Sequence, residues 1–329
     1  MFRKLKLGIA LGVLGAICIT GLAAAESLPA INFESGYTAG NINGQNGWTK
    51  TGSYDAAVAN VSGFPAASGY GFGTKALRIS DATTSGSFGD QTFSPGLANE
   101  AGETAADSGG SPIGTRQNHF EVSFQIGTTQ STEQPGLHVT MSPDRGDGGR
   151  MSYLRFDDLS DGVHVYFDDV TDAGPLGAPA DFNERVIGVL SRTQSHTIRM
   201  TIDFNDGPGN DVVQVFIDGN LAATGGTWED YYRFDPEQAG SGNLVPTVDK
   251  VLFREAGDAD AGNAGQGFLI DNLGLTSAPA STTPGGGGGG GGGGVAGQTG
   301  TKAKKCKKKK HKRSAESAKK KRCKKHKMH

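Results

Sequence analysis

The stretch from Ser195 to Gly226 constrains the fold of this chain more than any other, because its residues alternate between apolar and polar. Its first half has five residues on one face: His196, Ile198, Met200, Ile202 and Phe204. A period of two is typical of a half-buried β-strand. A turn-rich run then leads to a second apolar face made of Val213, Val215 and Ile217. Asp218-Gly219 predicts a tight hairpin, because such a turn needs residues that tolerate positive φ.

This succession of a strand carrying a His, a turn, a strand ending in Asp-Gly and a short return strand resembles the laminin-G-like and concanavalin A-like jelly rolls. The resemblance covers the residues from Ser195 to Gly226. It implies an antiparallel β-sandwich. It does not name a ligand, because function resides in sites that vary on a common fold.

Short alternating segments with turns between them also fill the chain from 120 to 190. Three of them have clear apolar faces, made of Phe120, Val122, Phe124 and Ile126; of Leu137, Val139 and Met141; and of Val163, Val165 and Phe167. Further strands are predicted at residues 31–36, 56–61, 75–80, 151–156, 182–190, 248–255 and 268–276, and a short helix at 228–238. This spacing predicts an all-β, antiparallel jelly-roll β-sandwich.

Composition divides the chain into four parts. Residues 1–25 carry three basic residues ahead of an apolar run and end in three alanines, which is typical of a secretory signal peptide rather than a membrane anchor. Residues 26–278 have the length of one jelly-roll domain, residues 279–300 form a Gly-rich linker, and residues 301–329 form a polybasic tail. We expect the linker and the tail to be disordered. The cysteines, Cys18, Cys306 and Cys323, all lie outside 26–278, so no disulfide stabilises the domain.

Charge is distributed very unequally along the chain. The tail holds 14 Lys, 2 Arg and 1 Glu, a net charge of +15, whereas residues 26–300 hold 13 basic and 33 acidic residues, a net charge of −20. The signal peptide predicts a secreted, extracellular protein. We therefore expect the tail to bind an anionic wall polymer or a membrane surface and to keep the protein at a cell surface. Nucleic acid is not an expected partner there, and the alternative is a tail that folds back on its own acidic domain.

The first and last predicted strands each carry a carboxylate, Glu34 and Asp271. Asp271 alternates in phase with Leu269, Leu273 and Leu275, so we expect it among apolar neighbours, where a carboxylate must be paired or must bind a cation. The opening Phe-Glu and the closing Asp-Asn also look like the ends of many secreted carbohydrate-binding jelly rolls. That resemblance implies a structural calcium ion, Ca2+, held by Glu34 and Asp271. The alternative is an Asp271 whose oxygens accept hydrogen bonds from backbone amides or an Arg.

A second candidate site is the outward face of the predicted strands. His164, Tyr166 and Asp168 lie opposite the apolar residues of their strand, and His138 lies opposite those of another. The same face is expected to include three residues of the strand at 120–126: Glu121, Ser123 and Gln125. A sheet face with aromatic, His and carboxylate groups can stack on a sugar and hydrogen-bond to it. The pattern therefore predicts a carbohydrate-binding face, with an ordinary solvated sheet face as the alternative.

Aromatic and charged residues are interleaved between Trp228 and Phe234. Trp228 and Tyr231 are candidate ligand-binding residues, because such a segment can line a cleft. The same segment can instead pack across the end of a sandwich as a plug. The sequence leaves both alternatives open.

The sequence contains little that indicates an enzyme. The glucanases with a similar jelly roll carry carboxylates in the pattern Glu-x-Asp-x-x-Glu, and no such segment occurs here. We assign no catalytic residue, although carboxylates from different strands can still meet. The favoured function is a secreted, non-catalytic module that binds a glycan. The alternatives are a glycan hydrolase or lyase of the same fold and a structural or adhesive surface protein.

Overall fold

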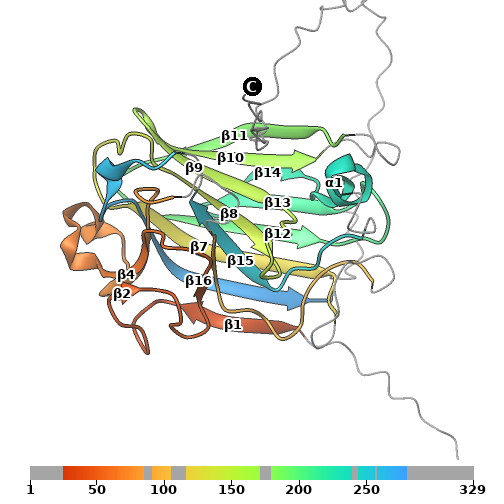
Figure 1. Ribbon diagram of the computed structural model, residues 1–329, viewed down its shortest axis with the longest axis horizontal. Helices are drawn as coiled ribbons and strands as arrows, with labels where there is room; N and C mark the ends of the chain where they lie inside the picture. The colour runs from red at the N-terminus through yellow and green to blue at the C-terminus, as the bar shows by residue number, and fades with distance from the viewer. Residues whose placement is uncertain are drawn as a thin grey trace, which may run out of the picture.

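The computed structural model describes residues 25–84, 91–104, 116–170, 179–238, 244–255 and 258–279. These residues form two antiparallel sheets that pack face to face (Figure 1), which confirms the predicted all-β sandwich. The predicted signal peptide, linker and tail lie almost wholly outside the described residues, so their boundaries stay predictions. Among the described residues, no helix has the length and apolar character needed to cross a membrane.

Sheet A contains the first and last strands of the domain. Its strands are β1 (Glu26–Ile31), β2 (Gly40–Asn41), β4 (Ala56–Asn60), β5 (Lys75–Ile79), β7 (His119–Thr128), β12 (His196–Asp203), β13 (Val212–Ile217), β14 (Asn220–Gly225) and β16 (Phe268–Ala278). They lie in the order β14-β13-β12-β7-β16-β5-β4-β2, and β1 pairs with β16 as well. The two ends of the domain are therefore hydrogen-bonded to each other.

Sheet B is built mainly from the middle of the chain. Its strands are β3 (Thr49–Lys50), β6 (Gln91–Phe93), β8 (His138–Asp144), β9 (Tyr153–Leu159), β10 (Gly162–Val170), β11 (Phe182–Leu190) and β15 (Lys250–Glu255). They lie in the order β11-β10-β9-β8-β15-β6-β3. The helices are short: α1 (Glu229–Phe234), η1 (Val61–Gly63), η2 (Pro65–Gly69), η3 (Pro236–Gln238) and η4 (Ala261–Asn263). The helix predicted at 228–238 corresponds to α1 and η3.

The position of β7 corrects one prediction. Glu121, Ser123 and Gln125 were expected on the same face as His138 and the outward residues of β10. Instead, β7 lies in sheet A between β12 and β16, while β8 and β10 lie in sheet B. The prediction was wrong because successive strands of a sandwich can cross from one sheet to the other, and alternation within a strand does not say which sheet it joins.

The core lies between the inner faces of the two sheets. Phe124 of sheet A meets Phe156 and Phe253 of sheet B edge-on, with ring centroids 6.2 and 5.8 Å apart. Trp48 is fully buried beside Phe253, and its Nε1 donates a hydrogen bond to the Tyr37 hydroxyl at 3.1 Å. Burial of each such side chain contributes about 1.5–3 kcal/mol. A core of this size holds the sandwich together without a disulfide.

The stretch from Ser195 to Gly226 forms β12, β13 and β14 as predicted. Asp218 and Gly219 both have positive φ, 51° and 78°, as a tight two-residue hairpin requires. The Asp218 side chain accepts from the backbone N–H of Thr197 at 2.8 Å and lies 2.7 Å from His196 Nδ1. His196 therefore ties the start of β12 to the tip of the neighbouring hairpin.

A bulge in β16 corrects the expected phase of Asp271. The register of β16 against β7 shifts just after Asp271, and Asn272 has a φ of 51°. Leu273 and Leu275 point into the main core, whereas Leu269 belongs to a second cluster on the other side of sheet A. Asp271 is therefore not in phase with Leu273 and Leu275, as the alternation had suggested. It is nevertheless fully buried.

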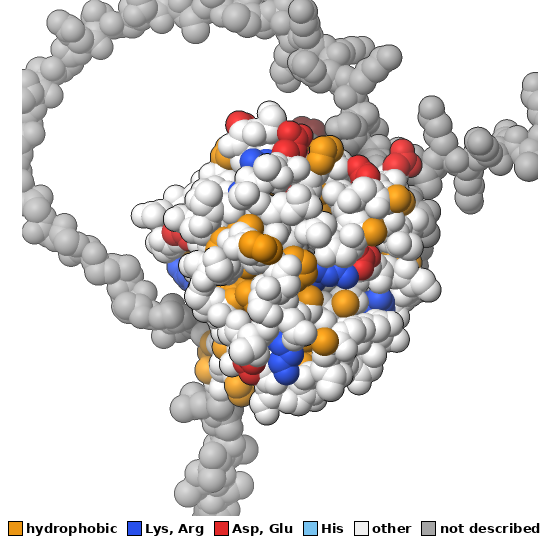
Figure 2. All heavy atoms as spheres, turned by 90° about the vertical axis from the view of Figure 1, so that its left-hand side faces the viewer, with side chains coloured by type: hydrophobic (Ala, Val, Ile, Leu, Met, Phe, Trp, Pro, Cys, Tyr) orange, Lys and Arg blue, Asp and Glu red, His pale blue; other side chains and the backbone are white. Residues whose placement is uncertain are grey.

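The two ends of the sandwich differ in character. One end carries η1 and η2 over the second hydrophobic cluster, which consists of Val61, Ala67, Tyr70, Ala76 and Leu269. Figure 2 shows this end, with hydrophobic side chains gathered near the middle of the face. The other end carries α1 (Figure 1), which covers the edge of the core there.

Candidate functional site

The outer face of sheet B brings together four of the residues predicted to bind carbohydrate. His164, Tyr166 and Asp168 belong to β10, His138 belongs to β8, and β9 lies between these two strands. Antiparallel pairing places outward side chains directly opposite one another across neighbouring strands. The face therefore has three rows, which we name the His164, Tyr166 and Asp168 rows.

The Tyr166 row is centred on an arginine. Arg155 of β9 pairs with Tyr166, and its guanidinium carbon lies 4.2 Å from the centroid of the tyrosine ring. The same guanidinium forms ion pairs with Asp157 at 3.1 Å and Glu184 at 3.3 Å. Val186 of β11 completes the row on the other side of Tyr166. Arg155 thus orients the Tyr166 ring and links the three rows.

The His164 row places a carboxylate between two histidines. Asp157 of β9 pairs with His164 on one side and with His138 on the other. Burial raises the pKa of Asp157, and the charges of Arg155, His138 and His164 oppose that rise. His164 Nε2 lies 2.8 Å from Asp161 Oδ1. The row therefore offers both hydrogen-bond donors and acceptors.

The Asp168 row holds two carboxylates side by side. Asp168 pairs with Glu184 of β11 and with Tyr153 of β9. Burial, followed by the negative charges of Glu184 and Asp169, raises the pKa of Asp168 to about 7. Near neutral pH this carboxyl group therefore exists in both forms, and it can donate as well as accept a hydrogen bond. Burial also raises the pKa of Tyr153, to about 12, so this phenol stays protonated.

An aromatic group borders the Asp168 row. Trp228 stacks on Tyr153, with centroids 5.8 Å apart, and its Nε1 donates to the backbone carbonyl of Asp168 at 2.9 Å. Phe182 and Tyr231 meet Trp228 edge-on at 5.0 and 6.0 Å. Trp228 and Tyr231 are half-buried and pack against the core. The segment thus packs across the end of the sandwich, and this packing holds its aromatic rings beside the predicted ligand face.

Sequence reasoning missed the residues that link the predicted ones. Tyr153, Arg155 and Asp157 of β9 and Glu184 of β11 lie in the same three rows. The alternation of β9 was visible in the sequence and marks its first three polar residues as outward. Which strands would become its neighbours was not visible, so the rows could not be assembled.

Glu34 and Asp271 are neighbours, but both have protein partners. Burial raises the pKa of Asp271 to about 6, and the nearby charge of Glu34 adds to the rise. Asp271 accepts from the backbone N–H groups of Asn272 at 2.8 Å and Gly73 at 3.4 Å. Glu34 accepts from the Thr74 hydroxyl at 2.5 Å. Backbone amides thus supply part of what Asp271 needs, and the shared calcium ion stays a prediction.

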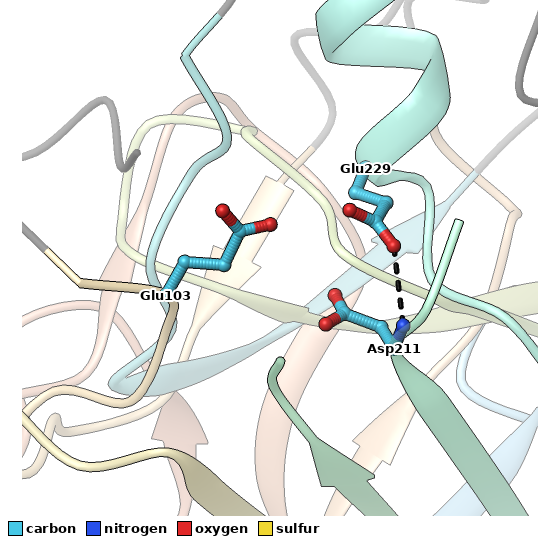
Figure 3. A group of neighbouring side chains, drawn as sticks. All are labelled: Glu103, Asp211 and Glu229. Atoms are coloured by element: carbon cyan, nitrogen blue, oxygen red, sulfur yellow. Dashed lines mark hydrogen bonds between the residues drawn. The ribbon is translucent and has the colours of Figure 1, made fainter. Parts of the chain in front are cut away.

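A further group of carboxylates, which the sequence reasoning did not find, lies at the end of the sandwich that carries α1 (Figure 3). Glu103 follows β6, Asp211 immediately precedes β13, and Glu229 is the first residue of α1. All three side chains are buried. One oxygen of each lies within 4.8 Å of an oxygen of each of the others. We name these residues the three-carboxylate cluster.

Two members of the three-carboxylate cluster are held firmly by hydrogen bonds. Asp211 accepts from the backbone N–H of Asn205 at 2.8 Å and from the Thr227 hydroxyl at 2.7 Å. Glu229 Oε1 accepts from the backbone N–H groups of Asn210 at 2.9 Å and of Asp211 at 3.2 Å (Figure 3). Backbone N–H groups of the turn between β12 and β13 therefore fix the positions of these two carboxylates.

The third member, Glu103, is only partly satisfied. One of its oxygens accepts from Arg233, whose guanidinium also lies 3.4 Å from Glu229 Oε2. The other oxygen, Oε1, is buried and accepts no hydrogen bond from the part of the chain that the structure describes. Burial is the largest cause that raises the pKa of Glu103, Asp211 and Glu229, each to about 7. Because the three carboxyl groups are buried next to one another, it is costly for all of them to be ionised at once.

No protein-family model matches this sequence, and no curated protein matches it either. Similar solved structures include an alginate lyase from Alteromonas sp.272, with a TM-score of 0.27, 11% identity and coverage of 49% of this chain and 73% of that one. Alginate lyase A1-II′, of polysaccharide lyase family 7, has a TM-score of 0.33, 13% identity and coverage of 62% and 80%. Caenorhabditis elegans galectin LEC-6 has a TM-score of 0.26, 11% identity and coverage of 58% and 96%. At such TM-scores these comparisons assign neither a ligand nor an activity to this chain.

Proposed function

We propose that the outer face of sheet B binds carbohydrate and that the protein acts as a non-catalytic glycan-binding module. The observation that carries the proposal is the make-up of the three rows. They combine two tyrosines, two histidines and three carboxyl groups around one arginine, with the aromatic group of Trp228 at their border. Sugars present hydroxyl groups together with apolar C–H faces, and this mixture of polar and aromatic groups complements both.

The hydrogen-bonding capacities on the face also suit a polyol. Arg155 only donates, Glu184 in its charged form only accepts, and Asp168 does either near neutral pH because its pKa is raised to about 7. Sugar hydroxyls donate and accept at once, so they can bond to all three. Thr140 of β8 pairs with Arg155, so the Tyr166 row crosses four strands. Strands lie about 4.8 Å apart, which gives a span of about 14 Å. That length suits an oligosaccharide better than a single sugar ring.

A second candidate function is a glycan hydrolase or lyase with its site on the same face. One observation favours it: the pKa of Asp168 is raised to about 7 by burial and by the neighbouring charges of Glu184 and Asp169. A carboxyl group that is half protonated near neutral pH is suited to general acid or base catalysis. We rank this candidate second because Asp168 borders an aromatic group that packs as part of the fold, and Trp228 Nε1 donates to its backbone carbonyl.

The proposal also includes a location outside the cell, at a cell surface. The basic segment before an apolar run in residues 1–25 supports secretion. The +15 charge of residues 301–329 supports retention at an anionic wall polymer or membrane surface, because each lysine or arginine near such a surface contributes about 1 kcal/mol. This attraction falls off within a Debye length and weakens with salt.

The test of binding is a glycan array probed with the full-length secreted protein. Each hit is then incubated with the protein, and new reducing ends or unsaturated products are measured. Binding without release supports the module. Release of product instead supports the hydrolase or lyase and overturns the non-catalytic proposal. A protein that binds no glycan on the array contradicts both, and leaves a structural or adhesive role.

The test of retention compares the full-length protein with a truncation that ends at Ala280. Both are incubated with intact cells and with anionic vesicles at low and high salt. We expect the full-length protein to be retained at low salt and released at high salt, and the truncation to stay in solution. Equal retention of the two proteins, or retention that ignores salt, contradicts an electrostatic anchor.

A further inference from the structure

We propose that the three-carboxylate cluster of Glu103, Asp211 and Glu229 binds one calcium ion. The cluster lies at the end of the sandwich that carries α1 (Figure 3), and it shares no residue with the Glu34 and Asp271 pair. The inference rests on the contacts of these three side chains and does not depend on the glycan proposal.

The first observation is an oxygen that lacks a partner. Glu103 is only 1% exposed, and its Oε1 atom is buried without a hydrogen-bond donor among the described residues. In Figure 3 the carboxyl group of Glu103 points towards those of Asp211 and Glu229. A buried carboxylate oxygen without a donor is strongly destabilised unless a cation or a proton compensates it. The unpartnered oxygen is therefore available to bind a cation.

The second observation is the charge of the group. Three ionised carboxylates carry −3, and the guanidinium of Arg233, which bonds to Glu103 and approaches Glu229, supplies +1. The remaining −2 equals the charge that one divalent cation neutralises. Arg233 binds an oxygen of each of two ligands, so it can orient them as outer hydrogen bonds do in metal sites.

The third observation is the spacing. Two oxygens bound to the same calcium ion at about 2.3–2.6 Å lie no more than about 5 Å apart. One oxygen of each carboxylate meets this condition, because all three lie within 4.8 Å of one another. The hydrogen bonds that fix Asp211 and Glu229 hold two of these ligands in place before any ion arrives.

The donor set points to calcium among the common metal ions. The cluster supplies only carboxylate oxygens, which suit hard cations, and it contains none of the His or Cys ligands that zinc and copper prefer. Magnesium demands octahedral geometry and keeps several waters, so an enclosed site of protein carboxylates does not favour it. Calcium accepts six to eight oxygens in irregular geometry, including both oxygens of one carboxylate.

The cation would connect three segments that are distant in the sequence: the chain after β6, the turn between β12 and β13, and the start of α1. Because Trp228 directly precedes Glu229, the ion would also hold the aromatic group in place. The expected consequence is a domain that is more stable with calcium than without it.

The test uses the full-length protein and two readouts. Thermal unfolding is measured in chelator and in increasing calcium, and terbium luminescence is measured with excitation of the tryptophans. An ion that binds only the folded state at about a hundredfold above its Kd should raise the Tm by roughly 5–10 °C. Glu103→Gln and Asp211→Asn should remove this rise and the terbium signal. The matched control is Glu121→Gln on the outer face of sheet A, where Glu121 pairs with Arg199, and it should keep both.

Each outcome bears on the proposal. A wild-type Tm that is unchanged by calcium overturns it, as does a folded Glu103→Gln variant that keeps the full rise. A second variant combines Glu34→Gln with Asp271→Asn. Loss of the rise in this variant but not in Glu103→Gln also overturns the proposal, because the ion then binds at Glu34 and Asp271. This second variant keeps the proposal testable should a variant of the cluster itself fail to fold.

Discussion

The outer face of each sheet carries an arginine stacked over an aromatic ring, but the residues around this pair differ between the two sheets. On sheet A, Arg199 lies over the ring of Phe216, with its guanidinium carbon 3.7 Å from the centroid, and forms an ion pair with Glu121 at 3.1 Å. On sheet B, Arg155 covers Tyr166 in the same way at 4.2 Å. The neighbours on sheet A are mainly Ser, Thr and Gln, namely Ser123, Gln125, Thr197, Thr201 and Gln214. Those on sheet B are histidines and acids.

This difference teaches that an aromatic ring beneath an arginine does not by itself make a binding face. On sheet A the pair covers the sheet and leaves simple polar groups around it. On sheet B the polar groups withdrawn from water include an arginine: Thr140 is 1% exposed and Arg254 is 4% exposed, although both lie on the outer side of their strands. Among the polar neighbours named on sheet A, Thr201 alone is buried, at 6% exposure. Polar groups that are shielded from solvent lie in a lower local dielectric, so they interact more strongly with a ligand than fully solvated groups do.

The largest expected effect comes from removing the two rings. Tyr166→Ala should weaken glycan binding about a hundredfold, because the stacked ring contributes both apolar area and orientation. Phe216→Ala, its counterpart on sheet A, should leave binding unchanged. Titration of both variants with an array hit measures the difference, and thermal melts check that each stays folded. Equal loss in the two variants would show that the comparison of the faces is mistaken.

The second prediction concerns Asp168 and pH. Its pKa rises from an ordinary value near 3.8 when unfolded to about 7 when folded, so the folded protein binds the proton more tightly. The Asp168 contribution therefore favours folding below about pH 4 and is lost as the pH rises towards 7. Asp168→Asn should stabilise the protein by about 2 kcal/mol above pH 7. Urea unfolding at pH 5 and pH 8 measures this, with Glu121→Gln on sheet A as the control.

A stabilisation of Asp168→Asn that is the same at both pH values would contradict this reasoning. It would mean that the asparagine improves packing rather than relieving a buried charge.

The smallest expected effect comes from the two arginines. Arg155→Met leaves Asp157 and Glu184 without their shared cation on a partly buried face and should destabilise the protein by about 1–2 kcal/mol. Arg199→Met breaks one more exposed ion pair and should cost about 0.5 kcal/mol. Urea unfolding of both variants gives the ranking. A larger loss of unfolding free energy for Arg199→Met than for Arg155→Met would contradict the view that the outer face of sheet B is the more strongly coupled of the two.

Much of sheet B could be predicted from the sequence because its strands alternate clearly. His164, Tyr166 and Asp168 stand opposite Val163, Val165 and Phe167, and the structure places the first set outward and the second in the core. Such alternation fixes which side of a strand a residue occupies. It does not fix the partner strand, so Arg155 and Glu184 could not be placed beside Tyr166 and Asp168.

Other features depend on contacts over long distances in the chain. Glu103, Asp211 and Glu229 come from three separate segments, and no local pattern marks any of them as buried. The bulge after Asp271 is equally hidden, because Asn272 adopts a positive φ that is uncommon for a residue other than glycine. One extra residue in a strand reverses the facing of everything that follows, so a prediction from periodicity fails at that point.

The place of β16 in sheet A has a consequence for how the chain reaches its fold during synthesis. This strand ends at Ala278, yet it lies in the interior of the sheet, paired with β7, β5 and β1. Until the ribosome has delivered it, the edges of β7 and β5 stay open to pairing with other chains. The domain therefore cannot mature piece by piece from its N-terminus. The nascent polypeptide therefore keeps these strand edges unpaired until residues 268–278 have joined the sheet.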